Sequence, residues 1–166
     1  LGRRSCCGTW RTRGTCVKEV ATFNTIQGFY TLNAAMKSPS HLRHGNDFML
    51  FKAGVKPMWE DENNRRGGRW RMSVESRKNS NFIRTDAYWS ELMGAFVTAS
   101  FSDDEDIVGI VVNRRAKGDK VSVWTRDVED EKVKNRIATR RTSERGAHCQ
   151  FNPEHQETPA QKLTNR

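Results

Sequence analysis

Long apolar runs, cysteine and proline are all scarce in this chain of 166 residues. No run approaches the roughly 18 apolar residues of a membrane span, and no apolar segment follows the N-terminus as in a secretory signal. The four cysteines match no zinc spacing, and two of them are adjacent: Cys6, Cys7, Cys16 and Cys149. We therefore expect neither a membrane protein nor a secreted one, and we expect free thiols in a reducing compartment.

Acidic residues are also the minority, with 20 Asp and Glu against 29 Lys and Arg and a net charge of +9. Such a balance favours a polyanionic partner, although a basic domain without one has the same composition. Apolar residues make up only 35% of the chain, but five Trp, eight Phe and two Tyr argue against wholesale disorder.

The two ends of the chain show little apolar pattern. Residues 1–20 are basic and rich in glycine, and they predict a flexible N-terminal segment. Residues 143–166 predict a C-terminal loop or tail. The residues between them, 21–142, carry regular patterns and predict one domain.

Within that domain the periodicity predicts three helices and two pairs of strands. Apolar residues at helical spacing, with capping residues before them, predict helices from about Asn24 to Pro39, over Asp86–Ser100 and over Glu129–Arg141. Alternating or continuous apolar runs predict the strands Asp47–Lys52, Trp70–Glu75, Ile107–Asn113 and Lys120–Thr125. The pattern predicts an α+β domain with a mainly antiparallel sheet.

One segment carries candidate binding chemistry: Lys56–Glu62, with the sequence KPMWEDE. A single Trp in such a turn most often packs against its own sheet edge while the acids face water. The functional interpretation is an indole face at Trp59 that stacks on a base, with Glu60 accepting hydrogen bonds from the N–H edge of guanine. A positively charged base would strengthen both interactions.

A second candidate is the hairpin turn Arg114–Lys120, with the sequence RRAKGDK. Its cations Arg115, Lys117 and Lys120 predict a phosphate site, although a solvated basic turn at a sheet edge fits equally. Trp10 would be the second wall of a stacking slot, unless it packs in the core.

These two segments carry a family resemblance. The runs DFMLFKAGVKPMWEDENNRRGGRW (residues 47–70) and VGIVVNRRAKGDKVSVWTRD (residues 108–127) resemble the eukaryotic translation initiation factor 4E family, the messenger-RNA 5′ cap-binding proteins. The resemblance extends over residues 23–137. It implies a curved antiparallel sheet with about three helices on its convex face and the cap slot on its concave face.

The resemblance also implies roles for the candidate residues. Trp59 would stack on 7-methylguanine, Glu60 would accept from its N1 and N2, and Trp124 would contact its N7-methyl group. Arg115 and Lys120 would bind the triphosphate, with Lys117 close by. No metal or cofactor is implied.

The chain departs from the family pattern at three places. The position of the family's second stacking Trp is Arg13 here, so that Trp10 either reaches the slot through a longer loop or the slot lacks one wall. The partner-binding back surface would consist of small or polar residues beside one apolar contact: Tyr30, Ser90, Gly94 and Ile26. The family's first and last strands have no clear counterpart.

The leading prediction is a monomeric, non-enzymatic cap-binding protein of translation initiation, located in the cytoplasm, with the nucleus as a second compartment. Expected partners are capped messenger RNA and, through a weakened back surface, the scaffold factor 4G or 4E-binding proteins. Loss of scaffold binding would make the protein a repressor. The alternatives are a basic RNA-binding module without cap selectivity and a metal-dependent hydrolase using Glu60, Asp61 and Glu62.

Overall fold

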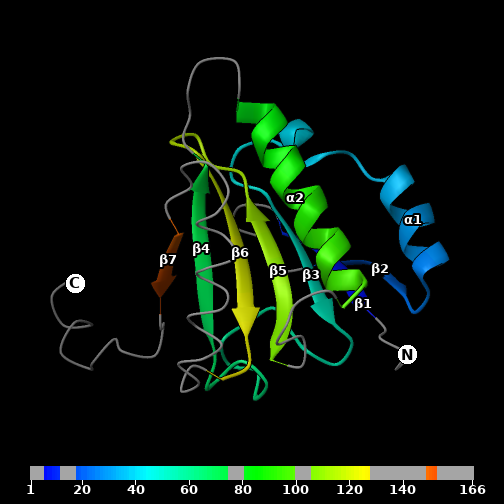
Figure 1. Ribbon diagram of the computed structural model, residues 1–166, viewed down its shortest axis with the longest axis vertical. Helices are drawn as coiled ribbons and strands as arrows, with labels where there is room; N and C mark the ends of the chain where they lie inside the picture. The colour runs from blue at the N-terminus through cyan, green and yellow to red at the C-terminus, as the bar shows by residue number, and fades with distance from the viewer. Residues whose placement is uncertain (1–5, 12–17, 75–80, 100–105, 128–148, 153–166) are drawn as a thin grey trace, which may run out of the picture.

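The computed structural model describes residues 6–11, 18–74, 81–99, 106–127 and 149–152. Its strands form one antiparallel sheet in the order β2-β1-β3-β5-β6-β4-β7 (Figure 1). The strands are β1 (Cys6–Arg11), β2 (Lys18–Phe23), β3 (Asp47–Lys52), β4 (Gly68–Val74), β5 (Ile107–Asn113), β6 (Asp119–Thr125) and β7 (Cys149–Asn152). The antiparallel α+β class predicted from the sequence is confirmed.

The helices α1 (Ile26–Ala35) and α2 (Asn81–Val97) lie on one side of this sheet (Figure 1). A short 3-10 helix, η1 (Pro39–His41), follows α1. Thr25 caps α1, since its side chain accepts a hydrogen bond from the Gly28 N–H at 3.0 Å. None of the helices within the described ranges has the length and apolarity that a membrane crossing requires.

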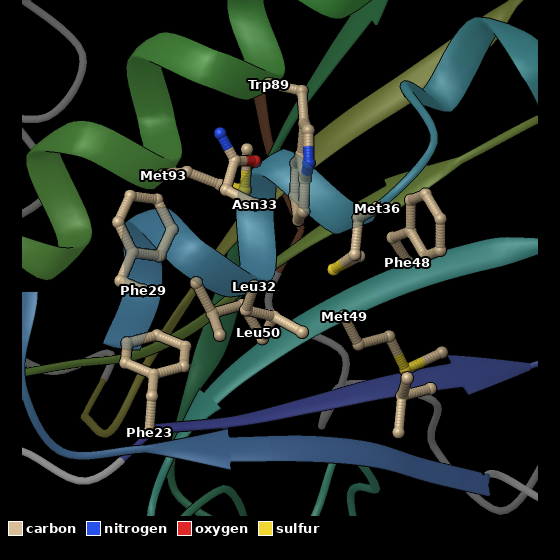
Figure 2. A pocket seen from close by; sticks show the side chains of 11 residues that line it. Phe23, Phe29, Leu32, Asn33, Met36, Phe48, Met49, Leu50, Trp89 and Met93 are labelled. Atoms are coloured by element: carbon tan, nitrogen blue, oxygen red, sulfur yellow. The ribbon is translucent and has the colours of Figure 1, made fainter. Parts of the chain in front are cut away.

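The sheet has a helix face and an open face, and each carries its own apolar cluster. The helix-face cluster includes Trp70, Trp89, Phe96 and Ile110, all buried. A cavity of about 30 Å³ lies in this layer and is lined by side chains of α1, α2 and the strands. Figure 2 shows these side chains. The open-face cluster consists of Met49, Phe51, Val55, Val108, Val111 and Trp124, with Trp59 packed against it.

Alternation along β4 assigns its residues to the two faces. Trp70, Met72 and Val74 are buried in the helix-face cluster, as the pattern predicted. Arg69 and Arg71 are half-buried and line a cavity on the open face. The same strand therefore contributes apolar side chains to the core and cations to the other side.

The predictions for both ends of the chain need correction. Two stretches of the expected flexible segment 1–20 are strands: β1 pairs with both β2 and β3, and β2 covers Lys18–Phe23. In the expected C-terminal tail, β7 pairs with β4. Backbone hydrogen bonds to a neighbouring strand form regardless of which side chains alternate. These strands therefore show no apolar periodicity in the sequence.

The second helix begins at Asn81, earlier than the predicted start at Asp86. Asp86 therefore lies within α2 and does not cap its start. Instead, the Asp86 carboxylate accepts hydrogen bonds from the Ser40 backbone N–H at 2.8 Å and from its hydroxyl at 2.6 Å, which ties α2 to η1. The predicted helix Glu129–Arg141 lies outside the described residues.

A buried ion pair anchors the β5–β6 turn. Arg114 and Asp119 are each about 95% buried and form a salt bridge, and the Thr85 hydroxyl of α2 donates to Asp119 at 2.9 Å. The Arg115 backbone N–H also donates to Asp119. Through Asp119, these contacts fix the turn that carries the candidate phosphate site to α2 on the helix face.

Candidate nucleotide-binding slot

The loop after β3 carries Trp59 and Glu60, and two polar side chains hold its shape. Asn64 is fully buried, and its amide donates to the carbonyl oxygens of Lys56 at 2.6 Å and Met58 at 2.8 Å. Asp61 accepts hydrogen bonds from the backbone N–H groups of Lys56 and Asn63 at 3.1 and 2.9 Å. The loop is therefore held by internal hydrogen bonds rather than by apolar packing alone.

The Asp61 carboxylate belongs to this network. Slight burial acts to raise the pKa of Asp61, but the hydrogen bonds from Asn63 and Lys56 and the Lys56 charge outweigh it and bring the pKa below its ordinary value. Glu60 and Glu62 on either side are exposed. No cluster of three potential metal ligands occurs among the described residues.

Trp59 lies against Trp124 on the floor of the open face. Their ring centres are 3.8 Å apart and the planes differ by 16°, so the indoles are stacked. Phe51 supports Trp124 from another side, with an edge contact at 5.4 Å and 73°. Trp124 is buried, and its indole N–H has no hydrogen-bond partner among the described residues. Trp59 is half-buried and sits on the loop.

The other end of the open face is cationic. Arg115 donates from Nη1 to the buried Asp47 carboxylate at 2.6 Å, which fixes its guanidinium at the start of β3. Lys120, the second residue of β6, lines the same cavity. Lys117 is exposed on the turn and lies outside the cavity lining. The structure thus brings two of the three predicted cations to the site.

Strand β4 contributes two cations that were missed in the assignment of site residues. Arg69 and Arg71 line the cavity, and the guanidinium carbon of Arg69 is 5.7 Å from the centre of the Trp59 ring. Burial, and secondarily the charge of Arg71, lowers the pKa of Arg69 to about 10. Alternation along β4 puts Arg69 and Arg71 on the face away from the core, so a strand pattern extended to Arg69 is the signal that could have found both.

Together these residues enclose a cavity of about 430 Å³, within the range of small-ligand sites. Four cationic side chains line it beside two acidic ones: Arg69, Arg71, Arg115 and Lys120 against Asp47 and Glu60. The indoles and Glu60 are at one end, and Arg115 is at the other. This arrangement suits a flat ring with N–H donors that is joined to a negatively charged group.

Trp10 does not lie in a loop, as expected, but in β1. The register puts it opposite Phe48, a member of the helix-face cluster, whereas Thr9 and Arg11 lie opposite Met49 and Asp47 of the cavity lining. Arg13 lies outside the described residues. The role of Trp10 as second stacking wall stays a prediction.

The predicted back-surface residues lie on the two helices of the helix face. Ile26 and Tyr30 on α1 are 48% and 62% exposed. On α2, Ser90 is exposed and Gly94 is half-buried, and a side chain added at Gly94 would meet nothing within 4 Å. The slot and this surface are therefore on opposite sides of the sheet.

Comparisons with known proteins agree with one another. The family model described as eukaryotic initiation factor 4E matches residues 9–162. Initiation factor 4E-3 of Caenorhabditis elegans is 46% identical over 124 residues, which cover 74% of this chain and 49% of the relative. The human factor 4E is 36% identical over 130 residues, covering 78% and 58%. The chain thus spans about half the length of these relatives.

Two solved structures share the fold. The C. elegans 4E-3 complex with the 4E-binding protein Mextli has a TM-score of 0.84 at 35% identity and covers 90% of each chain. The Ascaris suum 4E-3 complex with an m2,2,7G cap also has a TM-score of 0.84, at 37% identity, covering 93% of this chain and 91% of that one.

Proposed function

Because this chain belongs to the eukaryotic initiation factor 4E family, we propose that it binds the 7-methylguanosine 5′ cap of messenger RNA and acts in translation initiation or its regulation. The observation that carries the proposal is the cavity that joins the indoles and Glu60 to Arg115 and Lys120. The related Ascaris protein was solved with a methylated cap, which supports the same ligand class here.

Each end of the slot would recognise one part of the cap. Trp59 would stack on the methylated guanine, whose positive charge strengthens attraction to the indole and to the Glu60 carboxylate. Trp124 would contact the ring from the floor of the slot. Arg115, already oriented by Asp47, and Lys120 would bind the phosphates. Lys117, on the exposed turn, would contribute charge at longer range.

The test is quenching of Trp fluorescence by 7-methyl-GTP and, in parallel, by GTP. We expect a strong preference for the methylated nucleotide. Trp59→Ala should weaken binding by about 10–200-fold through loss of stacking. Glu60→Gln should weaken it by at least about tenfold, since a charge-assisted bond is lost. Glu62→Gln is the matched control, an exposed acid two residues away.

Equal affinity of the unmutated protein for both nucleotides would refute cap selectivity. That result would favour a basic RNA-binding module, whose affinity falls steeply with salt over many phosphates. Metal-dependent turnover of a cap dinucleotide would instead favour the hydrolase. The proposed binding itself consumes no ligand.

The helix face is the proposed partner surface. Ile26 and Tyr30 expose apolar area on α1, and Gly94 leaves open space on α2, which fits a weakly bound amphipathic helix from a scaffold factor or a 4E-binding protein. The C. elegans relative was solved with such a partner, Mextli. Retained cap binding with weak scaffold binding would make this protein a repressor. We propose that it acts as a monomer outside such complexes, in the cytoplasm and also the nucleus.

A further inference from the structure

We propose that Asp119 is a positioning residue for phosphate recognition, which acts on the ligand through Arg115 without touching it. The inference rests on the proposed function, because it takes Arg115 as a phosphate-binding group of the slot. The Asp119 side chain is about 95% buried and lies outside the cavity lining. Its effect on a ligand must therefore pass through another residue.

The Asp119 carboxylate closes the turn that carries Arg115. Backbone pairing between β5 and β6 reaches Asn113 and Lys120, so the turn lies beyond the last pair of the ladder. Within the turn, the Gly118 N–H donates to the Arg115 carbonyl at 3.1 Å. The Asp119 Oδ1 atom accepts from the Arg115 backbone N–H at 3.2 Å. These two bonds hold Arg115 by both its N–H and its carbonyl.

The other carboxylate oxygen fixes Asp119 from the helix side. Its Oδ2 atom accepts from the Thr85 hydroxyl of α2 at 2.9 Å and forms the salt bridge with Arg114. Arg114 also donates from Nη2 to the Ser40 carbonyl of η1 at 3.3 Å. Because charge-assisted hydrogen bonds are stronger than neutral ones, the carboxylate has little freedom to rotate.

The Arg115 side chain depends on the backbone of this turn. Its Nη1 atom donates to the Arg114 carbonyl at 2.8 Å as well as to Asp47. The Arg114 backbone N–H in turn donates to the Asn46 carbonyl at 2.9 Å, just before β3. A shift of this backbone therefore changes the acceptors of the guanidinium, and with them the direction in which it meets a phosphate.

The sign of the effect separates positioning from electrostatic attraction. Asp119→Asn removes a negative charge near the slot, and Coulomb attraction alone would then strengthen phosphate binding. If the carboxylate positions Arg115, the same substitution weakens phosphate binding, because the guanidinium is no longer held toward the phosphates. The quantity to measure is the ratio of the affinities for 7-methyl-GTP and 7-methylguanosine, which isolates the phosphates from the base.

Asp119→Asn should lower this ratio by about tenfold, since a misplaced Arg loses a charge-assisted hydrogen bond, and change nucleoside affinity by less than about twofold. In the Arg115→Gln background the same substitution should change the ratio by less than about twofold, because the group it positions is absent. Leu92→Ala, in the helix-face cluster, is the matched destabilised control and should leave the ratio unchanged. Thermal unfolding compares the stabilities of these variants.

Thr85 offers milder variants if Asp119→Asn does not fold, since a buried Arg114 without its partner is costly. Thr85→Val removes the donated hydroxyl and should lower the ratio by about threefold, whereas Thr85→Ser keeps the hydroxyl and should restore it. An unchanged or raised ratio in the Asn and Val variants, or an equal loss in the Arg115→Gln background, would overturn the proposal. Loss of methyl preference in the unmutated protein would instead refute the cap function, and the ratio could then still be read with GTP and guanosine.

Discussion

Gly109 supports the slot by having no side chain. It lies in β5 opposite Trp124, next to a bulge between Ile107 and Gly109. A Cβ built at Gly109 would come within 2.5 Å of the Phe51 ring, which makes the edge contact with Trp124. The absent side chain therefore leaves room for the ring that holds the slot floor in place.

Gly109→Ala should destabilise the protein by about 1–3 kcal/mol, because overpacking displaces Phe51. Nucleotide binding should weaken with it, as Trp124 loses its support. Urea unfolding and the 7-methyl-GTP titration measure the two effects. Gly94→Ala is the control, since that position is open and helical, and it should stabilise by about 1 kcal/mol. Equal stability of both variants would contradict the packing argument.

Single residues of the slot were predictable to different degrees. Trp59 and Glu60 were found because an indole next to acids in a turn is unusual by itself. Arg69 was missed because a cation beside a core strand normally indicates a solvated face. The self-stacking of Trp59 on Trp124 was also not foreseen, since it depends on how the loop folds back over the sheet.

At the scale of elements, the loop that presents Trp59 depends on Asp61. The pKa of Asp61 is lowered in the folded protein, so its ionised form is favoured by folding. This contribution to stability is present above the ordinary value of about 4 and is lost as the pH falls through the lowered value.

Asp61→Asn should therefore lower the melting temperature at pH 7 and weaken 7-methyl-GTP binding by up to about tenfold, because the loop no longer holds Trp59 in place. The difference in melting temperature should shrink as the pH is lowered below about 4. Thermal unfolding at several pH values measures this, with Glu62→Gln as the exposed neighbour that should show no such trend. A difference that grows toward acid pH would mean that Asp61 is not held as an anion.

Elements with strong internal patterns were predictable, and those formed by pairing alone were not. Asp47–Lys52 and Ile107–Asn113 were predicted at the bounds that the structure gives. By contrast, β1 and β7 have a mixed composition and pair with β3 and β4. Their strand state comes from the sheet edge they meet, which no local pattern records.

At the scale of the whole molecule, the sheet separates two surfaces. The slot is on the open face, while α1 and α2 cover the other (Figure 1). In the described part of the chain, the seven-stranded sheet lies between the two surfaces. Changes on the exposed surface of the helices should therefore leave the slot intact.

On the proposed partner surface, Gly94→Leu should strengthen binding of the 4E-binding protein Mextli by about fivefold, because the added side chain extends into open space where a partner helix would lie. Affinity for 7-methyl-GTP should stay within about twofold. Fluorescence anisotropy of labelled Mextli measures the first quantity and Trp quenching the second. Gly94→Ala, too short to reach a partner, serves as control. No gain with Leu would place the partner contact elsewhere.

The stacking of Trp59 on Trp124 affects how tightly a ligand binds. Trp59 occupies one face of Trp124 and is tethered there by its own loop, so the loop is an intramolecular competitor at high effective concentration. A base can enter between the two indoles only in those molecules in which Trp59 and Trp124 have separated. Its observed dissociation constant is the intrinsic one divided by that fraction. Substitutions that favour separation of the rings, while the loop keeps the Asp61 and Asn64 hydrogen bonds that shape it, would tighten binding without adding any contact to the ligand.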